Sequence, residues 1–244
     1  MKISKLYLVE DGFLYLGEVP ENHYHQHYAL QLMVSLEQNF VLQSQGQDWA
    51  TPGCFIPSQL PHCLLEAPSV VLLLVFPTSK LGQYCQSNFS STSVQPLSSS
   101  IQGSLLQLGK EYSHREVVGT EEMEAAYYQW KQKHLASNYS FLEMDGRIQT
   151  ILAWLQESIA QPVPAATAAQ QVHLSTSRFL HLFRKETGIT YRRMQLWMKL
   201  VQAYKQLEKA KNLTTLAHAV GFSDSAHLSR TFKETFGLSP SLLV

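Results

Sequence analysis

The stretch LAHAVGFSDSAHLSRTFKETFGLSPS, Leu216 to Ser241, decides the fold of the second half of the chain. It reads as a short apolar helix, a turn at Gly221, and a longer helix that begins behind polar capping side chains. The stretch LSTSRFLHLFRKETGITY, Leu174 to Tyr191, contains a second helix of the same kind, which begins behind polar capping side chains and ends at a glycine. The sequence therefore predicts two helix-turn-helix copies, joined by a long helix over residues 192–210. At a spacing of 49 residues, His181 aligns with Arg230, Phe183 with Phe232 and Gly188 with Gly237.

Helical periodicity gives the longer helix of each copy a buried face and an exposed face. Phe179, Leu182 and Phe183 should pack inward in the first copy, and Leu228 and Phe232 in the second. Arginine and histidine can donate to guanine, while serine suits phosphate oxygens or base edges. The candidate DNA-binding residues are the side chains that remain: Ser177, Arg178, His181, Arg184, Lys185, Ser225, Ala226, His227, Arg230 and Lys233.

On these residues, the block of about residues 145–244 resembles the DNA-binding domain of AraC/XylS-type transcription regulators. The resemblance implies two recognition helices that enter successive major-groove segments on one face of the duplex, about 34 Å apart. The chain departs from the family pattern at His173, where a turn glycine is usual, and at Leu180 and Ala226, where glutamine is frequent. The resemblance implies five base readers, which are Ser177, His181, Ala226, His227 and Arg230. Lys185 and Lys233 are expected to contact phosphates rather than bases, or to contact neither.

Charge is divided between the two parts of the chain. Residues 1–140 hold 7 Lys and Arg against 12 Asp and Glu, a net of −5, whereas residues 141–244 hold 12 against 7, a net of +5. This asymmetry indicates a basic module for a polyanion, which here is double-stranded DNA, and an acidic module with another task.

Composition limits the class of protein. With 244 residues, 45% of them apolar, the chain is long enough for two modest domains. The longest apolar run, residues 69–76, is too short to span a membrane, and no secretory signal is evident. Cys54, Cys63 and Cys85 are odd in number and form no CxxC pair, which favours a reduced, cytoplasmic protein.

The first part of the chain reads as short strands separated by glycine and proline, which predicts an all-β sandwich or barrel. Its motifs HQHYALQL and TPGCFIPSQLPH resemble the two cupin motifs, and many AraC/XylS-type regulators carry such a barrel as an effector domain. We therefore expect an α+β protein of two domains. A cupin-like effector or dimerisation domain covers residues 1–138, with its barrel over 1–80 and a helical segment over 101–136. An all-α domain with two helix-turn-helix units covers 139–244.

Histidines on alternate residues mark the candidate effector site. His25, His27 and Gln31 would share one face of a strand, and His62 would approach from a later strand. Three interpretations stay open: the imidazoles hold a divalent metal such as Zn or Ni, they bind an organic effector without metal, or they are hydrogen-bonded within the barrel. Gln31 stands where cupin enzymes usually supply a carboxylate, which argues against an iron enzyme.

The helical segment 101–136 also has two interpretations. Its apolar residues at helical spacing could form the face of a homodimer, as the same region does in family relatives, or could pack onto their own barrel. Residues 87–100, which precede this segment, are predicted to be a serine-rich loop. The apolar residues are Met123, Ala126, Tyr127, Trp130 and Leu135.

Together these patterns predict a cytoplasmic, bacterial-type transcription regulator that is not an enzyme. A small molecule or metal in the barrel would control DNA binding or dimerisation. An activator would also contact RNA polymerase, and no membrane partner is expected. The alternative is a cupin-type metalloenzyme with a helical accessory domain.

Overall fold

The computed structural model describes residues 4–19, 24–66, 69–115, 117–135, 144–157, 162–207 and 210–236. The chain divides into two compact units, one of residues 1–141 with 234–243 and the other of residues 142–233 with 244. The final described helix ends at residue 236 and is treated below with the second unit, to which most of it belongs. Within the described ranges, every helix is too short or too polar to cross a membrane. The two units are described separately below.

Antiparallel strands build the first unit. A six-stranded sheet has the order β1-β2-β8-β3-β6-β9, and a three-stranded sheet has the order β5-β4-β7. Fully buried and partly buried side chains alternate in β4, while β3 and β8 are buried along their whole length. The strands are β1 (Lys5–Val9), β2 (Gly12–Glu18), β3 (Leu30–Ser35), β4 (Phe40–Ser44), β5 (Gln47–Thr51), β6 (Gly53–Ile56), β7 (His62–Glu66), β8 (Ser69–Val75) and β9 (Gln95–Pro96).

The closed barrel that we expected over residues 1–80 is not observed among the described strands, which form two open sheets. The six-stranded sheet ends at β9, a strand of two residues in which Pro96 lacks the N–H needed to continue the ladder. An isolated antiparallel bridge between His25 and His62 lies outside the named strands. The prediction of a cupin-type barrel is therefore not confirmed, although the strands predicted for this part of the chain are present.

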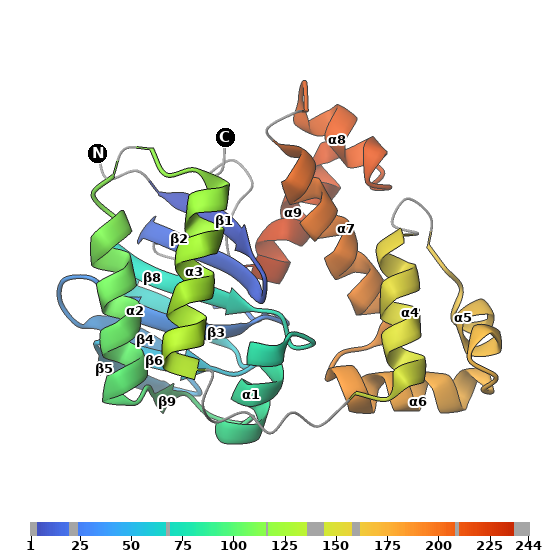
Figure 1. Cartoon of the computed structure of the whole chain (residues 1–244), viewed down its shortest axis with the longest axis horizontal. Helices are drawn as coiled ribbons and strands as arrows, with labels where there is room; N and C mark the ends of the chain where they lie inside the picture. The colour runs from blue at the N-terminus through green and yellow to red at the C-terminus, as the bar shows by residue number, and fades with distance from the viewer. Residues whose placement is uncertain are drawn as a thin grey trace. The chain divides into compact units, whose positions relative to one another are not determined.

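Two helices cover one face of the six-stranded sheet (Figure 1). Helix α2 (Ser99–Tyr112) packs against β3 and β8, and α3 (Thr120–Leu135) packs against β1 and α2. Gly109 permits the close approach of α2, because a Cβ atom at this position would collide with the side chains of Val71 and Leu36. The core of the first unit thus lies between this sheet and the helix layer.

The apolar side of α3 is part of this core and does not form a free face. Met123, Tyr127 and Trp130 are 0%, 1% and 5% exposed, and Ala126 packs against the same cluster. The indole N–H of Trp130 donates to Ser104 Oγ of α2 at 3.0 Å. These residues therefore follow the second of our two interpretations, packing within their own unit. The side chain of Leu135 lies outside the described residues.

The serine-rich segment is more ordered than we predicted. Helix α1 (Lys80–Asn88) extends into it, β9 lies inside it, and α2 begins at Ser99. Ser79 and Ser98 are the N-caps of α1 and α2, each accepting a hydrogen bond from a backbone N–H of the first turn. Serine favours helix starts because its hydroxyl satisfies a free backbone donor there, so serines that suggested a loop also act as caps.

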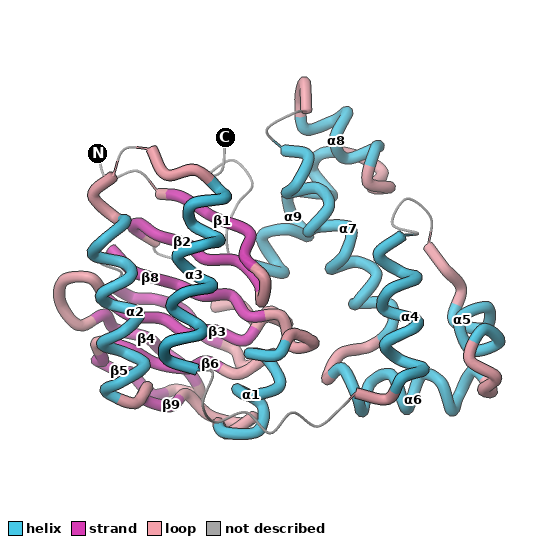
Figure 2. Tube along the Cα trace, in the orientation of Figure 1, coloured by secondary structure: helices cyan, strands magenta, loops and turns pink. Residues whose placement is uncertain are grey.

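The second unit is helical (Figure 2), as predicted. Asp145 caps the first helix, accepting from the Arg147 backbone N–H at 2.9 Å, and Ser175 caps the helix that ends at the left-handed Gly188. All three boundaries agree with the sequence-based prediction. The helices are α4 (Gly146–Glu157), α5 (Ala165–Gln171), α6 (Thr176–Thr187), α7 (Tyr191–Leu207), α8 (Leu213–Ala219) and α9 (Ser225–Phe236).

We call α5 with α6 the first helix pair and α8 with α9 the second helix pair. The short helices are offset by 48 residues and the longer helices by 49, so the second pair has one more residue in its turn. Each turn places a residue in the left-handed region, with φ of 56° at His173 and 79° at Gly221. His173 thus adopts a backbone conformation that suits glycine better.

Candidate nucleic-acid interface and candidate metal centre

Helix α6 presents a stripe of exposed side chains at i, i+3, i+4 and i+7 spacing: Ser177, Leu180, His181 and Arg184. Residues at this spacing lie along one side of a helix. We call this set the first stripe. It contains three of the five candidates predicted for α6, together with Leu180, which stands where glutamine is frequent in the family.

The opposite side of α6 is anchored in the core of the second unit. Phe179 and Phe183 are fully buried, and their rings lie 5.1 and 5.3 Å from the ring of Tyr191 in α7. Thr187 Oγ1 donates to the Phe183 carbonyl at 2.7 Å, which fixes the last turn. This packing sets the rotation of α6 about its axis and thereby decides which side chains form the first stripe. Arg178 and Lys185 are also exposed but lie beside the stripe.

Helix α9 carries the equivalent second stripe, composed of Ala226, Ser229, Arg230 and Lys233. Each member lies 49 residues after a member of the first stripe. Ala226, Arg230 and Lys233 are exposed, and Ser229 is partly buried. Leu228 and Phe232 are buried on the other side, as predicted. The sequence-based reasoning missed Ser229, although the same 49-residue spacing would have found it.

Two of the predicted α9 residues lie at its start and have partners inside the second helix pair. His227 Nδ1 lies 3.2 Å from Ser223 Oγ, and its ring stands edge-on to Phe222 with centroids 5.2 Å apart. Ser225 Oγ accepts from Thr214 Oγ1 of α8 at 3.5 Å. Arg230, by contrast, has no partner among the described residues, so its guanidinium can turn to a ligand. Within the second helix pair, the geometry therefore favours Arg230 over His227 and Ser225 as a donor to DNA.

Helix α7 holds both pairs through polar contacts that the sequence did not reveal. The side-chain amide of Gln195 accepts from the Val163 backbone N–H at 2.8 Å and donates to the Val163 carbonyl at 3.1 Å, before α5 begins. Lys199 Nζ donates to the Gly221 carbonyl at 3.2 Å, in the turn of the second helix pair. These contacts tie the entry of the first pair and the turn of the second pair to one helix.

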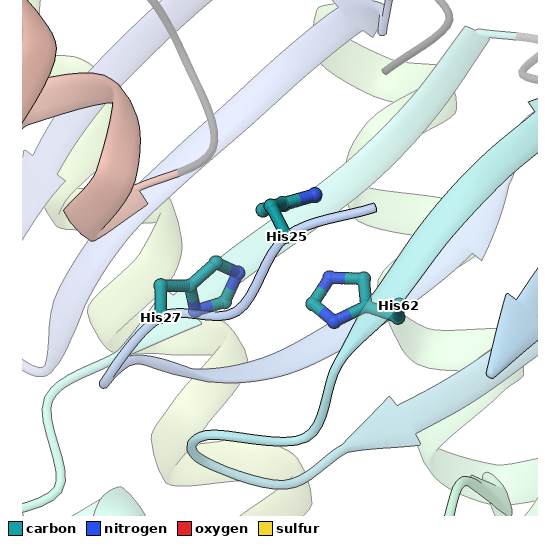
Figure 3. Close-up of side chains that lie close together, drawn as sticks. All are labelled: His25, His27 and His62. Carbon is teal, nitrogen blue, oxygen red and sulfur yellow. The ribbon is translucent and has the colours of Figure 1, made fainter. Parts of the chain in front are cut away.

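A second candidate site lies in the first unit, where His25, His27 and His62 converge (Figure 3). One ring nitrogen from each histidine lies within 4.8 Å of the others. His25 and His62 exchange two backbone hydrogen bonds, of 3.0 and 2.9 Å, which hold their segments side by side. The structure thus brings together the three histidines that we selected, whereas His23 lies outside the described residues.

The rings of His27 and His62 are oriented by backbone carbonyls. His27 Nδ1 donates to the Ala29 carbonyl at 3.1 Å, and His62 Nδ1 donates to the Leu60 carbonyl at 2.7 Å. Each Nε2 is therefore a lone-pair acceptor. Burial, reinforced by the neighbouring imidazoles, holds the pKa of His27 well below 6.5 and lowers the pKa of His62 to about 4. Both rings are neutral near pH 7, which is the form that binds metal.

Gln31 completes the cluster from β3. Its side chain is 5% exposed, and its amide nitrogen contacts His27 Nε2 and lies 3.4 Å from His62 Nε2. In this orientation the amide donates to two imidazole lone pairs. The opposite amide orientation would direct the carbonyl oxygen, a metal ligand, toward the same nitrogens. Among the described residues, no carboxylate or cysteine joins the three histidines, so Cys54 and Cys63 remain buried thiols apart from the cluster.

Comparison with known proteins supports the interpretation of the helical unit. Residues 168–243 match a family model described as a helix-turn-helix domain. Over 116 residues the chain is 31% identical to the HTH-type transcriptional activator RhaS of Pectobacterium carotovorum, covering 47% of this chain and 41% of that protein. RhaS of Escherichia coli is 33% identical over 95 residues, or 38% of this chain and 34% of the relative. The chain therefore spans less than half the length of the curated relatives it matches.

Over nearly its whole length the chain is also similar in fold to solved structures. ToxT of Vibrio cholerae aligns over 98% of this chain and 95% of its own, with a TM-score of 0.53 and 10% identity. At this identity the likeness concerns the fold alone. It supports an α+β organisation in which a strand-rich part precedes a helical part.

Proposed function

We propose that this chain, an AraC/XylS-family regulator, binds specific sequences of double-stranded DNA through α6 and α9 and thereby controls transcription. The observation that carries the proposal is the pair of equivalent exposed stripes, repeated at 49 residues in the basic part of the chain. Each stripe begins near a helix N-terminus and contains cationic or imidazole donors above a buried aromatic face. A helix of this kind fits the major groove, where such side chains reach base edges.

Recognition of a specific DNA sequence should depend most on Arg230. It is central to the second stripe, exposed, and without a partner among the described residues. A bidentate arginine contact to guanine contributes about 1–3 kcal/mol of discrimination. Arg184 and Lys233 stand one turn further along their stripes, where they can reach bases or phosphates.

Selection of bound duplexes from a randomised DNA library by the full-length chain tests this function. We expect one enriched sequence family, and Arg230→Ala should weaken binding to it selectively, by about 1–3 kcal/mol, while leaving binding to random DNA largely unchanged. Arg147→Ala is the matched control, because it also removes one exposed arginine but lies on α4, in an ion pair with Asp145. The absence of any enriched sequence, or equal losses on all DNA, would contradict the proposal.

The effector of the first unit is, in our proposal, a divalent transition metal bound by His25, His27 and His62. The support is the donor set: two neutral, buried imidazoles whose Nδ1 atoms are already committed to carbonyls, and a third ring nitrogen within 4.8 Å. Imidazole suits Zn²⁺ or Ni²⁺. The Gln31 amide accounts for the same cluster without metal, since it donates to the two Nε2 atoms that a metal would occupy. Metal binding would therefore require this amide to turn or move away.

Titration of Zn²⁺ and Ni²⁺ into the full-length chain distinguishes a metal-binding cluster from one held only by the Gln31 hydrogen bonds. We expect one ion per chain, loss of that ion in His27→Ala, and retention in His114→Ala, which removes an exposed histidine elsewhere. Metal should also change the affinity for the selected duplex, because an effector must bind two states of the regulator differently. Equal metal content in both variants would exclude the cluster as the site. An organic effector would instead bind the metal-free chain in a His27-dependent manner.

A further inference from the structure

The first stripe contains one apolar side chain among polar ones. Leu180 is 40% exposed, and no other large apolar side chain is exposed in the described part of the second unit. It lies on the first stripe between Ser177 and Arg184, at the edge that borders Phe183, three residues further along the helix. On α6 the fully buried side chains are Phe179, Phe183 and Thr187, whereas Leu180 leaves 40% of its side chain open to solvent beside them.

The neighbours of Leu180 restrict what it can contact. Ser177 precedes it by three residues, His181 follows it directly, and Arg184 is one turn further, all exposed. In the major groove, a side chain with no donor or acceptor can gain affinity only from an apolar group, and the C5-methyl of thymine is the apolar group that base pairs present there. A leucine among polar readers therefore matches thymine.

We propose that Leu180 is a specificity-determining residue, contacting the C5-methyl of a thymine in the half-site that α6 reads. This inference rests on the proposed DNA binding by α6 and adds the identity of one base. His181 and Arg184 follow Leu180 along the stripe and have the donors to contact neighbouring purines. The thymine should therefore have a purine close to it in the operator.

The second stripe has its aliphatic side chain at a different position from the first stripe. Position 229, which is equivalent to Leu180, is a serine, and the aliphatic member of the second stripe is Ala226, at the position of Ser177. The order of apolar and polar side chains thus differs between α6 and α9. The two half-sites should differ in sequence, and the thymine contacted by Leu180 should have no counterpart at the equivalent position of the α9 half-site.

Deoxyuridine tests the contact, because it lacks only the C5-methyl of thymine. In the duplex selected by the full-length chain, each thymine is replaced in turn by deoxyuridine, and the dissociation constant is measured by titration. We expect one position where the replacement weakens binding about three- to fivefold, the effect of losing one buried methyl contact. In Leu180→Ala, the same replacement should no longer weaken binding, because the side chain that contacted the methyl group is gone. Leu180→Gln should prefer adenine at this position, since glutamine pairs bidentately with adenine.

The outcomes separate this inference from the proposed function. Enrichment of a sequence without any deoxyuridine-sensitive thymine leaves DNA reading intact and overturns the role of Leu180. Sensitivity that persists unchanged in Leu180→Ala does the same, because another group would then contact the methyl. Failure to enrich any sequence overturns both. Circular dichroism checks that the Leu180 variants fold. We expect spectra like that of the wild type, because Leu180 is exposed.

Discussion

Asp11 is a buried carboxylate on which three elements of the first unit depend, and Asp11→Asn should destabilise that unit. The residue is 1% exposed at the turn between β1 and β2. Its Oδ1 accepts from the Leu81 backbone N–H at 3.1 Å, and its Oδ2 accepts from Tyr127 Oη at 2.9 Å and Lys131 Nζ at 2.6 Å. The carboxylate therefore connects the turn to the start of α1 and to α3.

The expected loss follows from these contacts. Removing one partner of a buried ion pair costs about 3–5 kcal/mol, because the remaining charge stays buried without compensation. The asparagine amide would also turn a donor toward Lys131. Lys131 retains Glu10, 2.9 Å away and 52% exposed, which softens the effect. We therefore expect Asp11→Asn to lower the free energy of unfolding by about 3 kcal/mol, the lower end of that range.

Urea denaturation of the full-length chain measures this difference, and amide exchange in β2 and β8 assigns it to the first unit. Glu10→Gln is the matched control: it removes a surface ion-pair partner of the same lysine and should cost less than about 1 kcal/mol. A loss below about 1 kcal/mol for Asp11→Asn, or equal losses for both variants, would refute the reasoning. The pKa of Tyr127, raised well above 10 by burial and then by Asp11, should fall in Asp11→Asn.

Three further predictions concern the helical unit. His173→Gly should stabilise it by up to about 1 kcal/mol in urea denaturation, because φ of 56° strains histidine; a loss of stability would contradict this. Gln195→Ala should lower the free energy of unfolding by about 1–2 kcal/mol, because it leaves the Val163 backbone N–H and carbonyl unpaired. An unchanged denaturation midpoint would show that these two hydrogen bonds do not stabilise the unit. Hydrogen bonds from Arg147 lower the pKa of Asp145 from 3.8 to about 2. The stability that the Asp145 carboxylate gives to α4 is therefore complete above about pH 4 and is lost as the pH falls through about 2. NMR titration should show this transition in the wild type and not in Asp145→Asn.

Much of the helical unit could be predicted from local sequence. The N-caps Asp145 and Ser175 and the left-handed Gly188 are signals carried by single residues, since they act on the backbone of their own turn. The 49-residue repeat then paired α6 with α9. The alternation of histidines likewise brought His25 and His27 to one cluster, because side chains two residues apart in an extended segment share a face.

The remaining features depend on contacts between distant segments. Gln195 and Lys199 read as ordinary polar residues of a long helix, and only the packing of α7 shows that they hold Val163 and Gly221. The expected barrel failed for a similar reason, since closure of a sheet depends on which edges meet and not on how many strands the pattern predicts.

The sequence by itself determined the organisation of the protein: a strand-rich part with histidines on alternate residues, and a basic helical part with a repeated motif. Helix caps, turn glycines and periodicity are local, so they can be read without a fold. Only the tertiary structure decided which interpretation held for α3, that Leu180 is exposed and Leu182 only partly buried on α6, and what surrounds Gln31. Those features depend on side chains far apart in the chain. The buried phenylalanines of α6 fix its rotation, and that rotation gives Leu180 the exposed position that its sequence neighbours alone did not indicate.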